Sequence, residues 1–184
     1  ATNGVGSDGE IKTGYIIVSD DPPPEYCAST GLSNANEWIA GVTIDGNVNN
    51  SGAAGYTDFT SIVLSLAPGS TVNVALTPGY SGKVQKEFWR IWIDFNGDND
   101  FEDADEQVLA ANNKRGVVNS SFSIPSYAGG QTRMRVSMKS GSSPAPCETF
   151  SKGEVEDYTV SFGAKGAFGN SDISQSKFEI YPNP

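Results

Sequence analysis

Oxygen-bearing side chains alternate along the stretch between residues 92 and 106, which begins as an apolar strand and becomes an acidic loop. The alternating side chains belong to Asp94, Asn96, Asp98 and Asp100, and the acids Asp105 and Glu106 follow. Hard cations such as calcium take about six to eight oxygen ligands, mostly from carboxylates and carbonyls. Oxygen ligands at positions 1, 3, 5 and 7 with an acid at position 12 or 13 can surround one ion. The spacing therefore predicts a calcium-binding loop.

The second half of this loop departs from the helical type of calcium loop. Its start matches the D-x-[DN]-x-[DN] pattern, but position 6 is Asn99 and not glycine. Gly97 and Asn99 both tolerate positive φ, which lets the backbone curl around an ion. The flanking residues are strand-like, so we expect the loop on a β scaffold. The alternative is a solvated acidic turn without an ion, although mutual repulsion among so many carboxylates favours the ion.

A second acidic group, Glu154, Glu156 and Asp157, begins the last predicted strand. Adjacent strand residues point to opposite faces of a sheet. Glu154 or Glu156 could therefore join the ion of the loop, with Asp157 on the other face. Alternatively, Glu156 or Asp157 pairs with Arg133 or Arg135 of a neighbouring strand. The sequence leaves both arrangements open.

Composition limits the chemistry available to this chain of 184 residues. Its net charge of −10 disfavours nucleic acid, because phosphate binding needs clustered Lys and Arg. It has no histidine, which removes histidine-based acid–base catalysis, nucleophile activation and zinc ligation. A hydrolase with two carboxylates is the remaining catalytic alternative, but its acids stand about 5 to 10 Å apart across a cleft, whereas these acids cluster. We therefore expect a protein that is not an enzyme and, lacking a long apolar run, does not span a membrane.

Cys27 and Cys147 are the only cysteines. An even pair in an acidic, glycine-rich chain of secreted character predicts one disulfide, with two buried free thiols as the alternative. The chain also has 21 Gly and 10 Pro and no long helical pattern, and short alternating strands separated by turn residues run through it. We predict an all-β fold, an antiparallel β-sandwich of jelly-roll type that carries the calcium loop and the disulfide.

Alternation along the strand at residues 86–94 predicts which side chains face the core. Trp89, Ile91 and Ile93 should point inward, which leaves Arg90 and Trp92 on a less buried face above the acidic loop. Aromatic rings on an open face can stack on sugar rings, which need large flat apolar surfaces beside polar groups. The residues expected to bind a ligand in this way are Trp92, Tyr56, Tyr80 and Tyr127, with Arg90 beside them. The alternative for each aromatic is core packing.

The segment from residue 153 to residue 160 reads Gly-Glu-Val-Glu-Asp-Tyr-Thr-Val, the signature that names the GEVED domain family. Further matching pieces are Cys27, residues 37–39, 55–60, 92–98 and 132–136, and Pro146-Cys147. The resemblance covers residues 26–162. It implies a non-catalytic accessory domain of a large secreted or surface protein, found beside proteases, polysaccharide-degrading enzymes or adhesin modules.

The ends of the chain resemble parts of other domains. Residues 1–19, with Tyr15-Ile16-Ile17-Val18, resemble the last strands of a PKD-type immunoglobulin-like domain, and residues 20–25 form a Pro-rich linker. Residues 163–177 are a Gly/Ser-rich linker. Residues 178–184, which end Tyr181-Pro182-Asn183-Pro184, resemble the start of a type IX secretion sorting domain. This resemblance implies contact with the type IX machinery and a secreted or outer-surface location in a Bacteroidota-type bacterium.

Two functions fit these expectations. The first is a calcium-stabilised module that holds a parent hydrolase on a polysaccharide or another extracellular matrix component. The second is a structural spacer or adhesive protein–protein module on the cell surface. An open face with stacked aromatics favours the first, and buried aromatics favour the second.

Overall fold

The structure is a computed structural model that describes residues 25–163. The predicted PKD-like tail, most of both linkers and the predicted start of a sorting domain lie outside the described residues. Within residues 25–163 every regular element is a β-strand.

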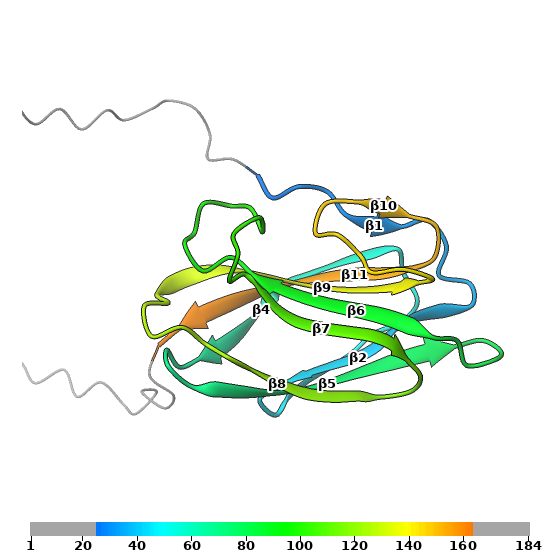
Figure 1. The fold of residues 1–184 in the computed structure, drawn as a ribbon, viewed down its shortest axis with the longest axis horizontal. Helices are drawn as coiled ribbons and strands as arrows, with labels where there is room; N and C mark the ends of the chain where they lie inside the picture. Colours follow the sequence, from blue (N-terminus) through cyan, green and yellow to red (C-terminus); the bar gives the residue numbers. More distant parts are fainter. Residues whose placement is uncertain (1–24, 164–184) are drawn as a thin grey trace, which may run out of the picture.

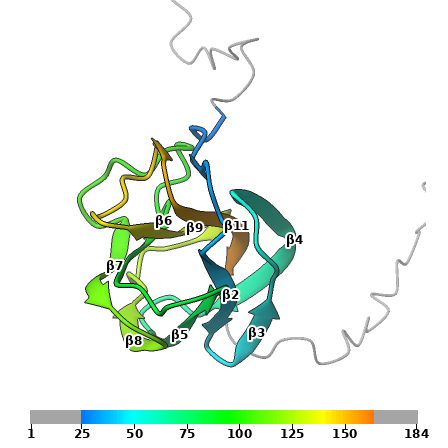
Figure 2. The ribbon, with the colours of Figure 1, turned by 90° about the vertical axis from the view of Figure 1, so that its right-hand side faces the viewer.

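Two sheets pack face to face (Figures 1 and 2). The four-stranded sheet has the order β3-β2-β5-β8, with strands Asn47–Asn50, Glu37–Ile44, Thr71–Tyr80 and Val118–Ser123. The five-stranded sheet has the order β4-β11-β9-β6-β7, with strands Tyr56–Leu66, Gly153–Phe162, Gly130–Ser140, Glu87–Ile93 and Gln107–Lys114. A two-stranded ribbon consists of β1 (Thr30–Gly31) and β10 (Thr149–Phe150).

This arrangement confirms the predicted all-β sandwich with one disulfide, which joins Cys27 to Cys147. Most neighbouring strands are not consecutive in the chain, so the chain crosses repeatedly between the sheets, as the jelly-roll prediction requires. The pairing is mainly antiparallel, with parallel exceptions at β4–β11 and β1–β10. Parallel neighbours need a long crossover, and the chain between β4 and β11 supplies it by building most of the sandwich.

Alternation along the strands places one apolar face of each sheet in a shared core. The predicted inward set Trp89, Ile91 and Ile93 of β6 is fully buried. Apolar residues at alternate positions of β5, β9 and β11 are also buried: Val72, Val74, Leu76, Met134, Val136, Met138, Tyr158, Val160 and Phe162. Period-two patterning was therefore sufficient to identify the core face.

Two local features do not follow from residue type alone. The segment 45–55 is rich in Gly, Asn and Ser but contains β3, which pairs with β2 through a tight turn with positive φ at Asp45 and Gly46. The large apolar side chain of Trp38 is only half-buried, on the opposite side of β2 from Ile39. A Cβ atom at Gly79 would lie 2.3 Å from the Trp38 ring, so the glycine leaves room for the indole on the neighbouring strand.

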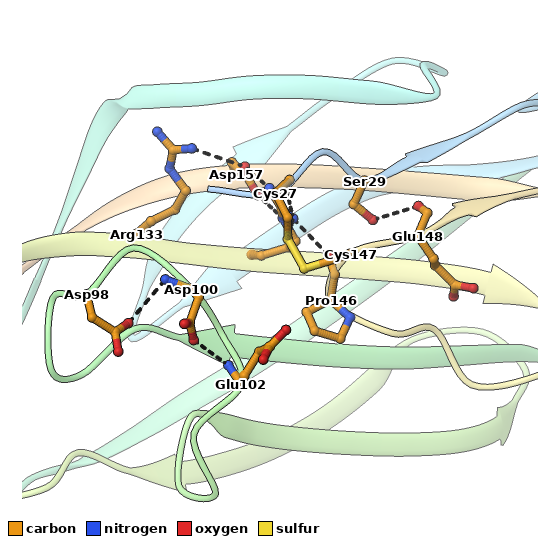
Figure 3. The surroundings of a disulfide bond; sticks show 11 residues. Cys27, Ser29, Asp98, Asp100, Glu102, Arg133, Pro146, Cys147, Glu148 and Asp157 are labelled. Carbon is orange, nitrogen blue, oxygen red and sulfur yellow. Dashed lines mark hydrogen bonds and ion pairs between the residues drawn. A yellow bond between two sulfur atoms is a disulfide. The ribbon is translucent and has the colours of Figure 1, made fainter. Parts of the chain in front are cut away.

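The outer face of the five-stranded sheet is covered instead of open to solvent. The segment that contains Cys27, the β9–β10 connection and the loop after β6 lie over it (Figure 2). The disulfide joins the first two of these coverings across a sequence separation of 120 residues (Figure 3). Phe101, from the loop after β6, is buried beneath them, with its ring centroid 5.1 Å from that of Tyr26. Side chains that alternate outward on β6, β9 and β11 therefore enter a second, partly polar interior.

Candidate functional site

The predicted calcium loop connects β6 to β7 and has buried acids at both ends. Asp94 follows β6 directly and Glu106 precedes β7, and both side chains are fully buried. The base of the loop is closed by the Ile93 amide, which donates to the Glu106 carbonyl at 2.9 Å. The strand pairing of β6 with β7 therefore holds the two acids side by side.

Three carboxylates converge inside this loop. One oxygen from each of Asp94, Asp98 and Glu106 lies within 4.8 Å of the other two. Backbone amides occupy part of the carboxylate capacity: those of Gly97 and Phe95 donate to Asp94 and Glu106 at 2.6 and 3.0 Å. Each carboxylate oxygen has two lone pairs, so these bonds leave acceptor capacity for a cation. An all-oxygen, triply anionic set fits a hard cation of the calcium type.

The backbone of the loop is curled as the sequence predicts. Gly97 and Asn99 have φ values of 76° and 71°. The side chains of Asn96, Asp98 and Asp100 each accept a hydrogen bond from the amide two residues further on, at 3.0, 3.2 and 2.8 Å. Such local bonds replace secondary structure in a turn. The alternating oxygens therefore contribute to the turns of the loop through local hydrogen bonds.

Other predicted ligands of the loop have different partners. Asn96 Nδ2 donates to Asp98 and Asp103 at 2.8 and 2.6 Å, so Asn96 bridges acids within the loop. Asp105 accepts from the Tyr127 hydroxyl on its exposed side. Asp103, which the sequence pattern did not single out, contacts the cluster through Asn96. The curvature of the loop brings Asp103 near the cluster, and the spacing of acids in the sequence does not reveal this curvature.

Burial and neighbouring charges change the acidity of Glu106. Burial first, and then the charges of Asp94 and Asp103, raise the pKa of Glu106 to about 7. Like charges that share a site disfavour ionisation of one another, and a bound cation reverses that effect. Burial and the neighbouring carboxylates thus both oppose ionisation of Glu106.

Glu154 and Glu156 do not reach this loop. They point into the sandwich, where Glu154 accepts from the Ile39 amide at 3.0 Å and from the Thr57 hydroxyl at 3.2 Å. Glu156 accepts from the hydroxyls of Ser51 and Tyr158, each at 2.5 Å. The prediction that one of them joins the ion of the loop is wrong, because hydrogen bonds hold both to groups of β2, β4 and the β3–β4 connection.

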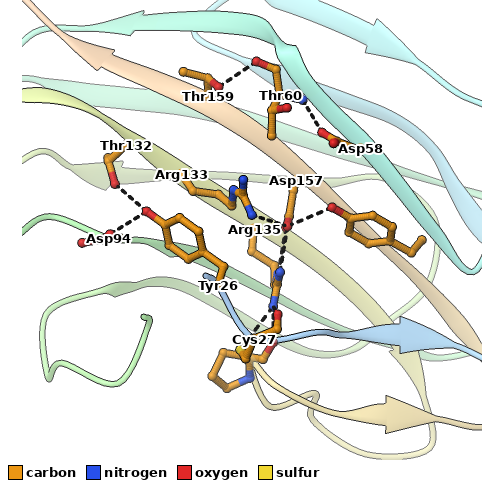
Figure 4. A network of polar contacts seen from close by, with 12 residues as sticks. Tyr26, Cys27, Asp58, Thr60, Asp94, Thr132, Arg133, Arg135, Asp157 and Thr159 are labelled. Atoms are coloured by element: carbon orange, nitrogen blue, oxygen red, sulfur yellow. Dashed lines mark hydrogen bonds and ion pairs between the residues drawn. The ribbon is translucent and has the colours of Figure 1, made fainter. Parts of the chain in front are cut away.

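Asp157 faces the other way and forms the predicted alternative, an arginine pair. Arg135 binds it with two parallel bonds, Nε to Oδ1 at 2.8 Å and Nη2 to Oδ2 at 2.7 Å, and both side chains are buried (Figure 4). The remaining Arg135 nitrogen donates to the carbonyls of Cys27 and Pro146, each at 2.8 Å. This arginine therefore attaches the disulfide-linked coverings to the sheet.

A hollow of about 310 Å³ lies beside this pair and is open to solvent. Tyr26, Tyr56 and Arg133 line it. The Arg133 guanidinium lies 4.3 Å from the centre of the Tyr26 ring and 3.8 Å from Asp157 Oδ2, and its side chain remains 30% exposed. Asp157 is already neutralised by Arg135, so Arg133 presents a largely unused cation to the hollow.

Tyr26 links the hollow to the loop. Its hydroxyl donates to Asp94 Oδ2 at 2.6 Å and lies 3.1 Å from the Thr132 hydroxyl (Figure 4). Burial first, and then the hydrogen bond to Asp94, raise the pKa of Tyr26 to about 12, so the phenol stays a donor at neutral pH. Any change in the charge around Asp94 therefore acts on one wall of the hollow.

The predicted ligand-binding aromatics do not form one platform. Trp92 and Arg90 are only 3% and 8% exposed, so the prediction of an open face there is wrong. The coverings bury them, and Arg90 donates to Asn112 and Ser143 at 2.9 and 2.7 Å. Tyr127 and Tyr80 lie elsewhere, beside Asp105 and Gln85. Among the residues lining the hollow, Tyr56 was predicted, whereas Tyr26 and Arg133 were not.

Comparison with known proteins gives a family match for part of the chain. Residues 88–161 match the model of the GEVED domain family. The match runs from β6 into β11 and includes the loop, and it supports the family implied by the signature at residues 153–160. No curated protein matches the chain. The resemblances of residues 1–19 and 178–184 remain predictions.

Among solved structures, one match is described as "X-Ray photoreduction of Polysaccharide monooxygenase CBM33". The two chains are 14% identical and superpose with a TM-score of 0.36. The alignment covers 54% of this chain, and this chain spans 59% of the other.

The first residue of the GEVED signature, Gly153, has a steric role. Its φ of 123° lies in the region that glycine favours, and a Cβ atom there would stand 2.0 Å from the Met138 carbonyl oxygen. β9 and β11 approach closely at this point. The signature thus combines a close approach of strands at Gly153, two inward acids and one outward acid.

Replacement of Arg135 by methionine should strongly destabilise the domain. It leaves the buried Asp157 with only the distant Arg133 at 3.8 Å and the Tyr56 hydroxyl at 3.3 Å, and breaking a buried pair in this way costs up to about 3–5 kcal/mol of unfolding free energy. Urea denaturation of Arg135→Met and of the control Arg133→Met measures the difference. The control should lose far less, because Arg133 is partly exposed and 3.8 Å from Asp157. Equal losses would show that Arg135 is not the anchor.

Glu154 should make stability fall as the pH rises. Burial first, with the charge of Glu156 adding to it, raises the pKa of Glu154 to about 7, whereas the carboxyl has its ordinary value of 4.5 in the unfolded chain. The folded state then binds the proton more tightly, so this stabilisation is complete below about pH 4.5 and is lost towards about pH 7. Melting of Glu154→Gln in chelator across this range should show a smaller decline than wild type. If the stability of Glu154→Gln declined as much as that of wild type, other acids would be the cause of the decline.

Proposed function

We propose that this chain contains a non-catalytic, calcium-stabilised accessory module of a secreted multidomain protein, which binds a polysaccharide or another matrix component. The convergence of Asp94, Asp98 and Glu106 within 4.8 Å carries the calcium part of the proposal. Two of these carboxylates are fully buried, and ionised groups are retained in such surroundings when a counter-charge accompanies them.

Calcium would act here as a structural ion. The three acids span the loop from its first residue to its last, so one ion would join both ends of the β6–β7 connection. The loop also supplies Phe101 to the covering of the outer face. Fixing the loop would therefore fix Tyr26 and the wall of the hollow beside it.

The hollow supports the ligand-binding part of the proposal. Tyr56 is 40% exposed at its edge, and Arg133 adds hydrogen-bond donors beside the ring. A sugar ring can lie on a tyrosine face while its hydroxyls bond to a neighbouring guanidinium. Volumes of about 300–1,000 Å³ are typical of small-molecule pockets, and this hollow is at the lower end, sufficient for one or two sugar units.

A structural or adhesive module is the second candidate. The burial of Trp92 favours it, since the most aromatic strand contributes its side chains to packing and offers none as a platform. In this case the disulfide, the Arg135–Asp157 pair and calcium would all serve rigidity between neighbouring domains.

Secretion and attachment belong to the same proposal. The resemblances of residues 1–19 and 178–184 support a longer exported protein, carried to the outer surface by type IX machinery, with this module targeting a parent hydrolase. The disulfide is consistent with an oxidising compartment. The described residues contain no helix long and apolar enough to cross a membrane.

Calcium should raise the melting temperature, and the loop should be the cause. Addition of calcium to chelator-treated protein should raise it by several degrees or more, whereas magnesium, which demands octahedral geometry, should act weakly. Asp98→Asn should reduce the rise, because it removes one carboxylate of the cluster at an exposed position that tolerates substitution. The matched control is Asp105→Asn, which should respond like wild type. A rise as large in Asp98→Asn as in wild type would place the calcium outside this loop.

Retention on an insoluble polysaccharide tests the hollow. We expect the purified chain to sediment with at least one of a panel of neutral and acidic polysaccharides in calcium. Tyr56→Ala and Arg133→Gln should reduce retention at least tenfold, whereas Tyr127→Ala, an exposed tyrosine remote from the hollow, should not. Absence of retention on every polysaccharide would favour the structural module.

A further inference from the structure

A second pair of acids lies at the other end of the sandwich from the calcium loop. Glu37 begins β2 of the four-stranded sheet, and Glu87 begins β6 of the five-stranded sheet. In Figure 1 these strand starts are on the right, near the β5–β6 connection, whereas the loop after β6 is at the upper left. Glu37 lies two residues before Ile39, and Glu87 lies two residues before Trp89. Residues two apart in a strand share a face, and Ile39 and Trp89 are fully buried, so both acids point between the sheets.

These carboxylates are buried without the partners that other buried acids have. Glu37 is 2% exposed and Glu87 is 0% exposed. Glu37 Oε1 and both oxygens of Glu87 have no hydrogen-bond partner among the described residues. By contrast, Glu154, Glu156 and Asp157 are each bound by hydroxyl, amide or guanidinium groups. A buried carboxylate without such compensation carries a large desolvation cost.

A polar hollow of about 350 Å³ adjoins Glu37 and provides an independent indication of a ligand. Glu37 lines it together with neutral oxygen-bearing side chains from Asn36, Gln85 and Ser140. Glu87 does not line the hollow itself, but its cross-strand partner Ser140 does. Gln85 Nε2 donates to the Lys83 carbonyl at 3.2 Å, which leaves its amide oxygen available. The space accommodates an ion and several waters.

We infer that Glu37 and Glu87 form a second cation site, which takes a hard divalent ion of the calcium class through carboxylate, amide and hydroxyl oxygens and water. Calcium accepts irregular arrangements of six to eight oxygens, so two carboxylates and a wet polar hollow can satisfy it. Lys83 and Lys152 also line the hollow, but no ion pair joins either of them to Glu37 or Glu87 in residues 25–163. The two acids therefore have no ion-pair partner among these residues, which leaves a place for a counter-charge from outside the chain.

Such an ion would join the two sheets. β2 and β6 belong to different sheets. The disulfide between Cys27 and Cys147 lies over the outer face of the five-stranded sheet and not at this end of the sandwich. Burial first, and then the charge of Glu37, raise the pKa of Glu87 to about 7, which reflects the cost of two anions in one place. A proton shared by the carboxyls is the competing way to lower that cost.

Ion counting in single-site variants separates this site from the loop. Calorimetric titration of the purified 184-residue chain with calcium, combined with elemental analysis, should give two ions per chain. Asp98→Asn should leave one ion, Glu87→Gln should leave one, and the double variant should bind none. Asp105→Asn is the matched control and should retain both.

The variants should also differ in stability. In chelator, Glu87→Gln should melt at least as high as wild type, because it removes one of two repelling charges, but calcium should raise its melting temperature less. Glu37→Gln should behave in the same way, so the result does not depend on the folding of one variant. If Glu87→Gln and Glu37→Gln both bound as many ions as wild type, and raised the melting temperature only in chelator, the two carboxyls would share a proton. That result would overturn the cation site. One ion in wild type, lost in Asp98→Asn, would also overturn it while leaving the loop intact.

Discussion

The buried pair between Arg135 and Asp157 determines how the outer side of the five-stranded sheet is organised. A buried carboxylate needs a counter-charge, and the planar guanidinium supplies it with two parallel bonds. The same guanidinium binds the carbonyls of Cys27 and Pro146, so neutralisation of one acid also fixes the two segments that the disulfide joins. Other polar contacts, such as that between Arg90 and Ser143, also join the coverings to the sheet, but this pair binds both disulfide-linked segments at once.

From this anchor, one continuous series of contacts reaches the calcium loop. Tyr26 precedes Cys27, packs against Phe101 of the loop and donates to Asp94. The ring of Phe101 also lies 5.1 Å from the Arg135 guanidinium. The ion pair, the disulfide, the hollow and the acidic loop are therefore parts of one assembly, in which the position of each depends on the others.

The sequence predicted the inner half of this molecule better than the outer half. Alternation identified the core residues of β6 and β9, and residue type identified the curled backbone at Gly97 and Asn99. It failed for Trp92 and Arg90, because alternation says which side chains leave the core but not what lies beyond the sheet. Here segments distant in the sequence cover the outer face, and the residues of β6 carry no pattern that would predict this covering. The hollow beside Tyr26 depends on the same coverings.

The acids show why residue type alone did not assign their roles. Buried carboxylates in this domain are stabilised in different ways: Asp157 by a guanidinium, Glu156 by two hydroxyls, and Asp94 by amides, a phenol and the neighbourhood that we assign to calcium. Each solution is set by what the neighbouring strand or loop presents, at sequence separations that range from 2 residues for Tyr158 to 105 for Ser51. A cluster of acids in the sequence therefore indicates that compensation must exist. Which partner provides it follows only from the fold, and Glu87, whose carboxylate oxygens have no hydrogen-bond partner among the described residues, is where we infer an external ion.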